Sequence, residues 1–147
     1  MIVLGISAFF HDSACALIKD GEVLFAAQEE RFSRIKYDES FPSQAIVSCL
    51  NHCELLLDDI DQIVYFDKPL LKFNRIIESH LSNFPKGLES FKASLPKWLG
   101  QKLFTEKTIK KKLKNIQMGE YKKNIKFSSH HLSHAASTFY PSPFESA

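Results

Sequence analysis

Residues 2–28 read IVLGISAFFHDSACALIKDGEVLFAAQ, and this stretch decides the fold. It contains three apolar runs at 2–7, 14–18 and 22–28, and the turn-forming sequence Lys19-Asp20-Gly21 joins the last two. The pattern predicts a three-stranded antiparallel meander. Because the strands are almost uniformly apolar, we expect helices to cover both faces of the sheet, as in α/β proteins.

The rest of the chain alternates helical and extended patterns. A helix is expected from Ser43, with one apolar stripe formed by Ile46, Cys49, Leu50, Cys53 and Leu57. The pattern then predicts a strand at 62–66, a helix at 70–81, a helix around 105–116, a strand at 125–128 and a helix at 131–140. We interpret 68–126 as a variable helical insertion in one α/β domain that spans 1–147.

The composition limits the class of protein. The chain has 147 residues, of which 44% are hydrophobic and 24% charged, and it has no apolar run long enough for a membrane span. Three cysteines are too few for a disulfide framework, and the amino end carries no signal-peptide pattern, so we expect a soluble cytoplasmic protein. The five glycines are far apart, which excludes Walker and Rossmann phosphate loops.

The net charge of +2 conceals a basic segment. Residues 102–126 hold nine lysines against Glu106 and Glu120, a local balance of +7. One hypothesis is a binding module that attaches to nucleic acid through this segment. We favour a solvated amphipathic helix, because Ile109, Leu113 and Ile116 form an apolar stripe and no aromatic residue lies between the lysines of 107–114. We therefore expect neither nucleic acid nor a membrane as partner.

Three histidines concentrate in the sequence SSHHLSHA at 128–135, where a predicted strand meets a helix. His130 and His134 are four residues apart and so share a helical face, which lets both rings reach one metal ion. His131 is the reserve ligand, because a spacing of three from His134 also allows a shared metal. The alternative is that these histidines only cap the helix or pack in the core.

Two other motifs carry polar groups. His11, Asp12 and Ser13 lie in AFFHDSA at 8–14, between two strands, where backbone amides and side chains could hold a phosphate or an acyl phosphate. An ordinary hairpin turn is the alternative.

In QEERFSRIK at 28–36, the cations Arg31, Arg34 and Lys36 could bind phosphate oxygens. The alternative is that they form a solvated, charged segment after the strand. Cys49, His52 and Cys53 share a helical face, but we interpret the cysteines as core residues.

Four stretches together resemble a known family in the same order along the chain. They are ISAFFHDSACAL at 6–17, AQEERFSR at 27–34, HHLSHAAS at 130–137 and FYPSPF at 139–144. They resemble the amino-terminal domain of the nodulation-type O-carbamoyltransferases, a family that includes antibiotic-modifying enzymes. The related tRNA threonylcarbamoyl-transfer enzymes lack the His11-Asp12-Ser13 wording and are the weaker alternative.

The resemblance implies an actin-like, ribonuclease H-like ATPase fold and a two-step reaction. Carbamoyl phosphate and ATP would form carbamoyl-adenylate, and the carbamoyl group would pass to a hydroxyl of a sugar or natural product. His11 matches the histidine that contacts carbamoyl phosphate, and Lys36 matches a basic residue of that site. His130 and His134 match the pair that binds a divalent metal (iron, zinc, magnesium or manganese) beside the nucleotide phosphates.

Full members of this family are several times longer than this chain. The resemblance therefore implies that the chain is an incomplete domain, without the downstream half and the carboxy-terminal domain. We expect the missing half to be a partner, together with carbamoyl phosphate, ATP and a hydroxyl-bearing acceptor. The chain alone is expected to be inactive, because holding acyl phosphate, nucleotide and metal in one geometry requires the missing residues.

Overall fold

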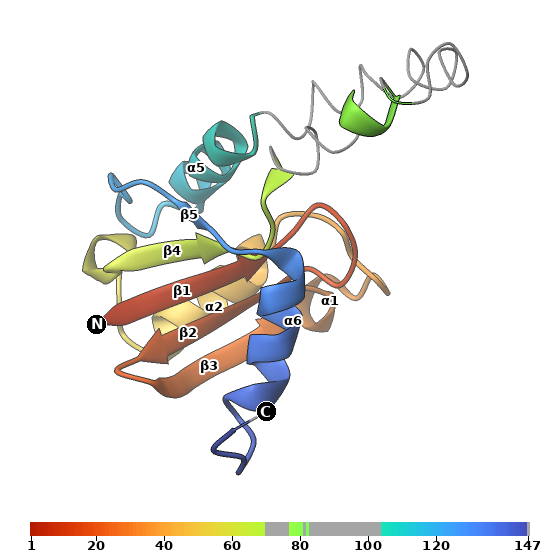
Figure 1. Ribbon diagram of the computed structural model, residues 1–147. Coiled ribbons are helices and arrows are strands. Elements are labelled where there is room, and N and C mark those ends of the chain that lie inside the picture. The colour runs from red at the N-terminus through yellow and green to blue at the C-terminus, as the bar shows by residue number, and fades with distance from the viewer. Residues whose placement is uncertain (70–76, 81, 83–103, 147) are drawn as a thin grey trace.

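The computed structural model describes residues 1–69, 77–80, 82 and 104–146, and it has an α/β architecture built on one five-stranded sheet (Figure 1). The strand order is β3-β2-β1-β4-β5. The elements are β1 (Ile2–Ser7), β2 (Ala14–Lys19), β3 (Glu22–Gln28), α1 (Glu30–Ser33), α2 (Ser43–His52), the 3-10 helix η1 (Leu57–Asp59), β4 (Gln62–Tyr65), α5 (Thr105–Ile116), β5 (Lys126–Phe127) and α6 (His130–Phe139).

The sheet is mixed, and the connections explain why. β1 pairs antiparallel with β2, and β2 pairs antiparallel with β3. Asp20 and Gly21 both have positive φ, at 51° and 95°, which is what a two-residue hairpin turn between β2 and β3 requires. β4 pairs parallel with β1, because α2 carries the chain back across the sheet, and β5 pairs parallel with β4.

Helices α2 and α5 pack on one face of this sheet. Figure 1 shows α2 behind the strands, and its apolar stripe (Ala45, Ile46, Cys49 and Leu50) is fully buried. On the sheet the buried residues alternate, as a strand with one face in the core requires. Leu4 and Ile6 of β1 are at most 2% exposed, whereas Val3 and Gly5, the residues that directly precede each of them, are half-buried. The core therefore lies between the sheet and these two helices.

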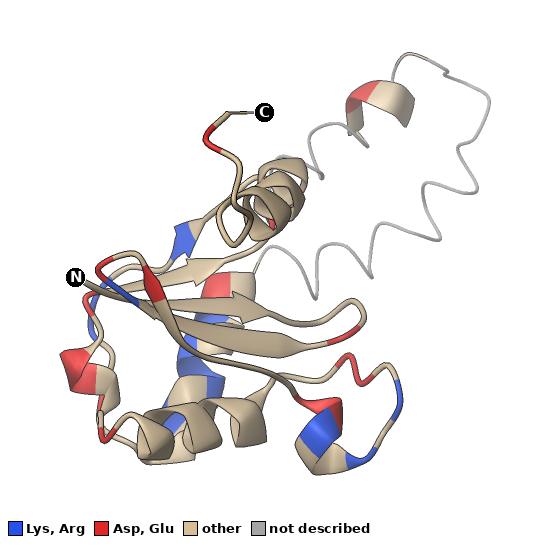
Figure 2. Cartoon of the chain, turned by 90° about the horizontal axis from the view of Figure 1, so that it is seen from below, with Lys and Arg blue, Asp and Glu red and all other residues tan. Residues whose placement is uncertain are grey.

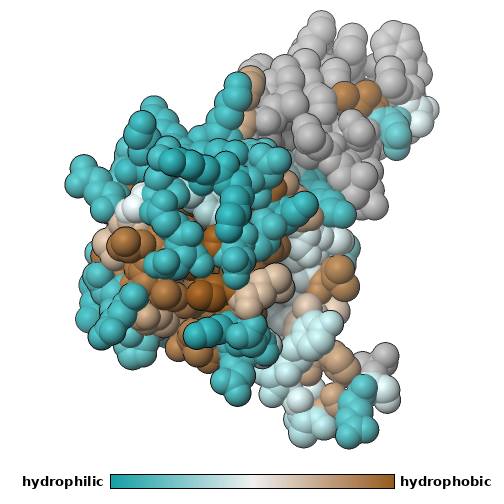
Figure 3. Space-filling view, turned by 90° about the vertical axis from the view of Figure 1, so that its left-hand side faces the viewer, coloured by the Kyte–Doolittle hydropathy of each residue, from teal (hydrophilic) through white to brown (hydrophobic). Residues whose placement is uncertain are grey.

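The other face of the sheet is covered only in part by the described residues. There α6 crosses the strands at one end (Figure 1), while Val23 of β3, which pairs with Ile18, stays 57% exposed. The described residues therefore do not by themselves give the cover on both faces that the sequence analysis expects. Uniformly apolar strands indicate that both faces can be buried, but they do not say which residues bury them. Figure 3 views the molecule from the left-hand side of Figure 1, where the amino terminus lies, and shows exposed hydrophobic side chains surrounded by hydrophilic ones.

Helix α5 has the two-sided character that the lysine-rich sequence predicts. Ile109 and Leu113 are buried, whereas the lysines of the helix are exposed except for the half-buried Lys110. Figure 2 colours lysine and arginine residues blue. Lys110 forms an ion pair with Glu106 at 2.9 Å, one helical turn earlier. In the described part of the chain, no helix is long and apolar enough to cross a membrane.

Most predicted elements are observed within one or two residues of the expected bounds. The helices expected at 105–116 and 131–140 are found at Thr105–Ile116 and His130–Phe139. The strand expected at 125–128 is reduced to Lys126–Phe127, and the short helix α1 was not predicted. Most of the helix predicted at 70–81 lies outside the described residues, as does the segment 83–103.

Candidate functional site

The turn that carries His11, Asp12 and Ser13 leaves the sheet at the carboxyl end of β1. Phe9 and Asp12 adopt left-handed backbone conformations, with φ of 66° and 49°. Such angles are uncommon for residues other than glycine and persist only where surrounding contacts enforce them. The turn is therefore a shaped loop with a defined backbone, rather than a regular two-residue hairpin.

The loop at 34–40 supplies those contacts. The backbone N–H of Phe9 donates to the carbonyl oxygen of Glu39 at 2.9 Å, and that of Ser13 donates to the carbonyl oxygen of Asp38 at 2.8 Å. Asp38 is itself buried, and its carboxylate accepts a hydrogen bond from the backbone N–H of Ser40 at 2.9 Å. The structure thus brings the His11 turn and the loop that contains Lys36 side by side.

Ser13 is the most deeply buried polar residue of the turn. It is 1% exposed, and its Oγ has no hydrogen-bond partner among the described residues. A buried hydroxyl without a partner loses the hydrogen bonds it would make to water, so such groups are rare and call for an explanation. A ligand oxygen or an ordered water that reaches Ser13 would satisfy it.

The charged side chains around this turn point toward solvent. His11 Nδ1 lies 2.9 Å from the Asp12 carboxylate, and 56% of the His11 side chain is exposed. Lys36 Nζ sits over the ring of Tyr37, 4.8 Å from its centroid. Arg31, on α1, is also exposed and lies 4.0 Å from the Glu30 carboxylate.

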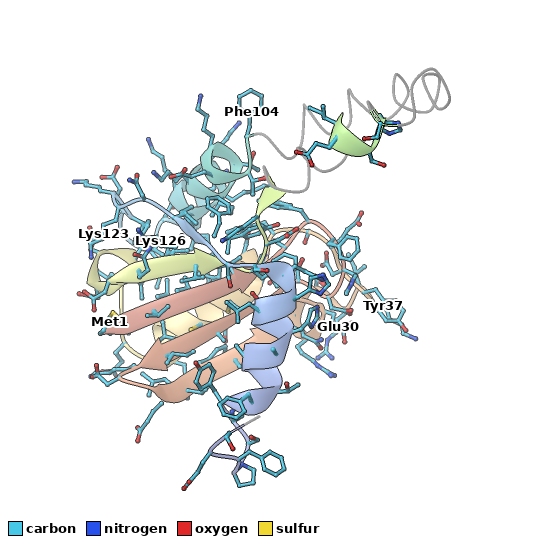
Figure 4. The ribbon with its side chains drawn as sticks, in the orientation of Figure 1. Met1, Glu30, Tyr37, Phe104, Lys123 and Lys126 are labelled. Carbon is cyan, nitrogen blue, oxygen red and sulfur yellow. The ribbon has the colours of Figure 1, made fainter. Side chains whose placement is uncertain are left out.

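Glu30 and Tyr37 mark where this loop lies. Figure 4 labels both on the same side of the molecule, opposite to the side of Lys123 and Lys126. The backbone N–H of Tyr37 donates to Glu30 Oε2 at 3.1 Å, which fastens the Lys36 loop to α1. Lys36 and Arg31 therefore belong to one surface region, although the Arg31 side chain pairs with Glu30 rather than pointing at the turn.

His130 and His134 meet at the start of α6. Their Nε2 atoms are 3.2 Å apart, and their rings are nearly perpendicular, at 83°. The spacing of four on one helical face therefore gives the proximity that the sequence analysis predicts. The His131 ring lies farther off, 5.8 Å from that of His130 between centroids.

This histidine pair has the geometry of two ligands of one metal ion. Two nitrogens each about 2.0–2.1 Å from a zinc ion at the tetrahedral angle are themselves roughly 3.3 Å apart. The observed distance of 3.2 Å between the two Nε2 atoms matches this value. Within the described residues, however, no group of three or more histidine, cysteine, aspartate or glutamate side chains could hold a metal. The pair alone therefore does not make up a metal site, and no third candidate ligand lies beside it in this part of the chain.

The two motifs emerge from the same end of the sheet. The His130 ring packs edge-on against Phe66, whose backbone N–H donates to the carbonyl oxygen of Ile6 at 3.2 Å. Beside it, the Tyr65 hydroxyl donates to the carbonyl oxygen of Ala8 at 2.7 Å. Parallel strands present their carboxyl ends at one edge, where α/β proteins bind ligands. The His11 turn and the histidine pair are therefore neighbours along that edge.

Neither of two cavities in the molecule is lined by these residues. A groove of about 970 Å³ lies between α1, α2 and α5, and a hollow of about 470 Å³ lies along α6. These two cavities therefore do not coincide with the candidate site.

Cys49 lies in the core, as expected, whereas Cys53 follows the end of α2 and is only half-buried. Cys15 and Cys49 are buried, and the contact with Cys49 together with burial raises the pKa of the Cys15 thiol. The ring of His52 packs against Phe25, with centroids 5.6 Å apart. These side chains fill space between α2 and the sheet, and the structure gives no support to a metal site there.

The sequence analysis missed the role of Glu29. This residue is 3% exposed, and its carboxylate accepts hydrogen bonds from the backbone N–H groups of Gln44 and Ala45 at 3.0 and 2.8 Å. Its own N–H donates to the carbonyl oxygen of Ser13 at 2.7 Å. Glu29 thus ties the His11 turn to the start of α2. The only signal in the sequence is a carboxylate directly after an apolar strand, which does not identify its partners.

Comparison with known proteins agrees with this arrangement of motifs. Residues 2–147 match the family described as "Carbamoyltransferase N-terminus". The chain belongs to this family of carbamoyltransferase amino-terminal domains, which confirms the resemblance drawn from the sequence. The uncharacterized protein sll1178 of Synechocystis sp. is 47% identical over 149 residues, which cover 99% of this chain and 24% of that protein.

A second relative carries a more informative name. The nodulation protein NolNO of Sinorhizobium fredii is 35% identical over 144 residues, which cover 95% of this chain and 19% of that protein. An uncharacterized 19.2 kDa protein of Rhizobium etli is 38% identical over 60 residues, or 41% of this chain and 35% of that protein. This chain spans at most about a quarter of the two longer relatives.

Proposed function

We propose that this chain is the amino-terminal part of an O-carbamoyltransferase. The enzyme would use carbamoyl phosphate and ATP to form carbamoyl-adenylate and then transfer the carbamoyl group to a hydroxyl of a sugar or natural product. The observation that carries the proposal is the match of residues 2–147 to the carbamoyltransferase amino terminus, supported by the similarity to NolNO. Free cysteines are typical of proteins in a reducing compartment, which supports a cytoplasmic enzyme.

We further propose that the sheet is the first part of an actin-like, ribonuclease H-like ATPase domain. Three consecutive antiparallel strands followed by parallel strands reached through helical crossovers support this fold. In this proposal the turn after β1 approaches phosphate groups.

The residues of the turn have complementary roles in the proposal. His11 and Lys36 donate hydrogen bonds or positive charge to carbamoyl phosphate, and both steps of the reaction develop negative charge on phosphate oxygens. Asp12 holds His11 through the 2.9 Å contact at Nδ1, which leaves Nε2 for the substrate. The buried Ser13 hydroxyl offers a further donor, and Arg31 on α1 adds positive charge.

His130 and His134 would hold a divalent metal ion, with His131 as the reserve ligand. Imidazole ligands suit iron and zinc better than magnesium or manganese. When bound, the metal would neutralise charge on the phosphates of ATP. The role of this chain is to present two imidazole nitrogens 3.2 Å apart on a helix that Phe66 positions.

Metal binding is measured on the chain itself by equilibrium dialysis with zinc or ferrous ion. We expect weak binding at one site, because only two ligands are present, and loss of that binding in His130→Ala and in His134→Ala. His80→Ala is the matched control and should bind as the unchanged chain does. Equal binding by all these variants would contradict the metal role, and loss in His131→Ala alone would make His131 the ligand.

Activity is measured in the full-length Synechocystis relative, because this chain spans 24% of it. With carbamoyl phosphate and ATP we expect pyrophosphate release and a carbamoyl-adenylate product in mass spectrometry. Replacing the residue aligned with His11 by asparagine should abolish both, while the residue aligned with His52 serves as control. Normal turnover after the first change would refute the role of His11, and absence of any adenylate in the unchanged protein would refute the proposed reaction.

A further inference from the structure

The end of the described chain has an unusual composition. Residues 127–144, FSSHHLSHAASTFYPSPF, contain no aspartate, glutamate, lysine or arginine, although such residues make up 24% of the sequence. An uncharged stretch is usually buried in a core. Here it forms α6 and the turn that follows, and no residue of α6 is buried.

Large apolar side chains of this stretch are exposed. Leu132, Tyr140 and Phe144 are 63%, 80% and 70% exposed. With Ala135, Ala136 and Phe139 they line the hollow of about 470 Å³ along α6. We call these six residues the α6 surface. The helix is held to the sheet from its other side, where Ser133 Oγ donates to the carbonyl oxygen of Phe66 at 3.1 Å.

These properties are those of the centre of a protein interface. Interface centres are depleted of charged residues and enriched in aromatic ones, and a few aromatic anchors carry most of the binding energy. Contiguous exposed apolar surface marks an interaction site or a liability for aggregation. Tyr140 and Phe144 have the size and exposure of such anchors, and the hollow between them and α6 can receive a side chain of a partner.

We propose that the α6 surface binds a polypeptide equivalent to the part of the related proteins that lies beyond their matched amino-terminal stretch. The lengths support this occupant, because the chain matches an amino-terminal family along residues 2–147 yet covers only 24% and 19% of two relatives. The position of the surface supports it too. The same helix carries the histidine pair, whose further ligands do not lie among the described residues.

This inference extends the proposed function by naming the surface where the remainder of the enzyme docks. Binding of that polypeptide would cover the outer side of α6 and bring its side chains to the histidine pair. The tests below measure association without any substrate, so that association and carbamoyl transfer can fail independently of each other.

The first test co-expresses this chain with a tagged polypeptide that begins where the matched stretch of the Synechocystis relative ends. We expect co-purification as a one-to-one complex, with its mass measured by light scattering. Tyr140→Ser combined with Phe144→Ser should weaken the association at least tenfold. Leu56→Ser, at a residue 49% exposed and distant from α6 in the sequence, is the matched control and should leave it unchanged. Circular dichroism verifies that each variant folds.

Undiminished association of the double variant would overturn the proposal. So would a homodimer of this chain that the same two substitutions dissociate, because the α6 surface would then be an interface between copies. A second measurement decides the case in which the two pieces fail to associate. Amide hydrogen exchange in the segment aligned with 130–144 should be at least tenfold slower in the full-length relative than in this chain. Equal exchange rates would overturn the proposal.

Discussion

The carboxylate of Glu29 accepts a hydrogen bond from the backbone N–H of Ala45 at 2.8 Å, across the junction between β3 and α2. The first N–H groups of a helix have no partner within it, and a side-chain oxygen usually satisfies them from the preceding residue. Here Pro42 precedes the helix and offers no such oxygen, and Glu29 takes that role from a distant part of the chain. Its negative charge also favours the positive end of the helix dipole.

Glu29→Gln should destabilise the fold by about 1–3 kcal/mol, the cost of leaving a buried amide without its acceptor. The glutamine amide replaces one of the two acceptor oxygens by an NH2 donor, which would then face the backbone N–H of Gln44 or Ala45. Urea unfolding measures the difference, with Glu22→Gln as a matched control at an exposed residue of β3. Equal stability of the two variants would contradict the capping role of Glu29.

Tyr65→Phe should cost about 1–2 kcal/mol of stability, because the carbonyl oxygen of Ala8 loses the buried hydroxyl that donates to it at 2.7 Å. Burial and the nearby charge of Asp67 raise the pKa of Tyr65, so its phenol remains a donor at neutral pH. Tyr37→Phe, at a side chain 61% exposed, is the control and should be nearly neutral. Equal melting temperatures of the two variants in thermal unfolding would refute this role of the Tyr65 hydroxyl.

Gly119→Ala should destabilise more than Gly21→Ala, although both glycines have positive φ, of 89° and 95°. Each alanine carries the strain of that backbone conformation, of order 1 kcal/mol. A methyl group at Gly119 would also collide with the carboxylate of Asp58, which accepts a hydrogen bond from the backbone N–H of Glu120 at 2.8 Å. A methyl group at Gly21 meets open space. Denaturant midpoints in the reverse order would contradict this account.

Asp38 should make the fold sensitive to acid. Hydrogen bonds from Ser33 and Ser40 hold the pKa of its carboxyl below the usual value. The unfolded chain therefore binds the proton more readily, and stability rises with pH in this window. The contribution of Asp38 is complete above the unfolded-state pKa of about 3.9 and is lost as the pH falls through the lower folded-state value. Asp38→Asn should reduce the change in unfolding free energy between pH 5 and pH 3, as followed by urea titration. An unchanged pH profile would show that Asp38 does not contribute.

Repeating patterns along the sequence were sufficient to predict most of the architecture. The apolar stripes of α2 and α5 occur every three or four residues, so their helical faces follow from local order alone. The end of α2 does not, because the stripe is expected to continue to Leu57, whereas the helix ends at His52 and Leu57 lies in η1. The hairpin between β2 and β3 follows from Asp20 and Gly21. The cover of the second face could not be predicted, because an apolar strand does not record its tertiary neighbours.

In the candidate site, too, one part could be predicted from the sequence and another could not. The proximity of His130 and His134 follows from a spacing of four within one helix. The contacts that support the His11 turn do not follow from local spacing. One of them joins Tyr65 to Ala8, which are 57 residues apart in the sequence. Arg34 and Tyr37 adopt left-handed backbone conformations in the neighbouring loop. The sequence does not predict this, because such conformations are expected at glycine or asparagine.

The lysines of α5 determine how the protein should respond to ionic strength. Among the described residues, Lys110 forms an ion pair with Glu106, whereas Lys107, Lys111 and Lys114 have no carboxylate partner. Each of these three lysines lies three or four residues from another lysine of the helix. Like charges at these spacings repel each other, and dissolved ions screen exposed charges beyond about 10 Å at 0.1 M salt and about 3 Å at 1 M. Added sodium chloride should therefore relieve a mutual repulsion that dilute buffer leaves in place. The free energy of unfolding is therefore expected to be larger at high sodium chloride concentration than in pure water.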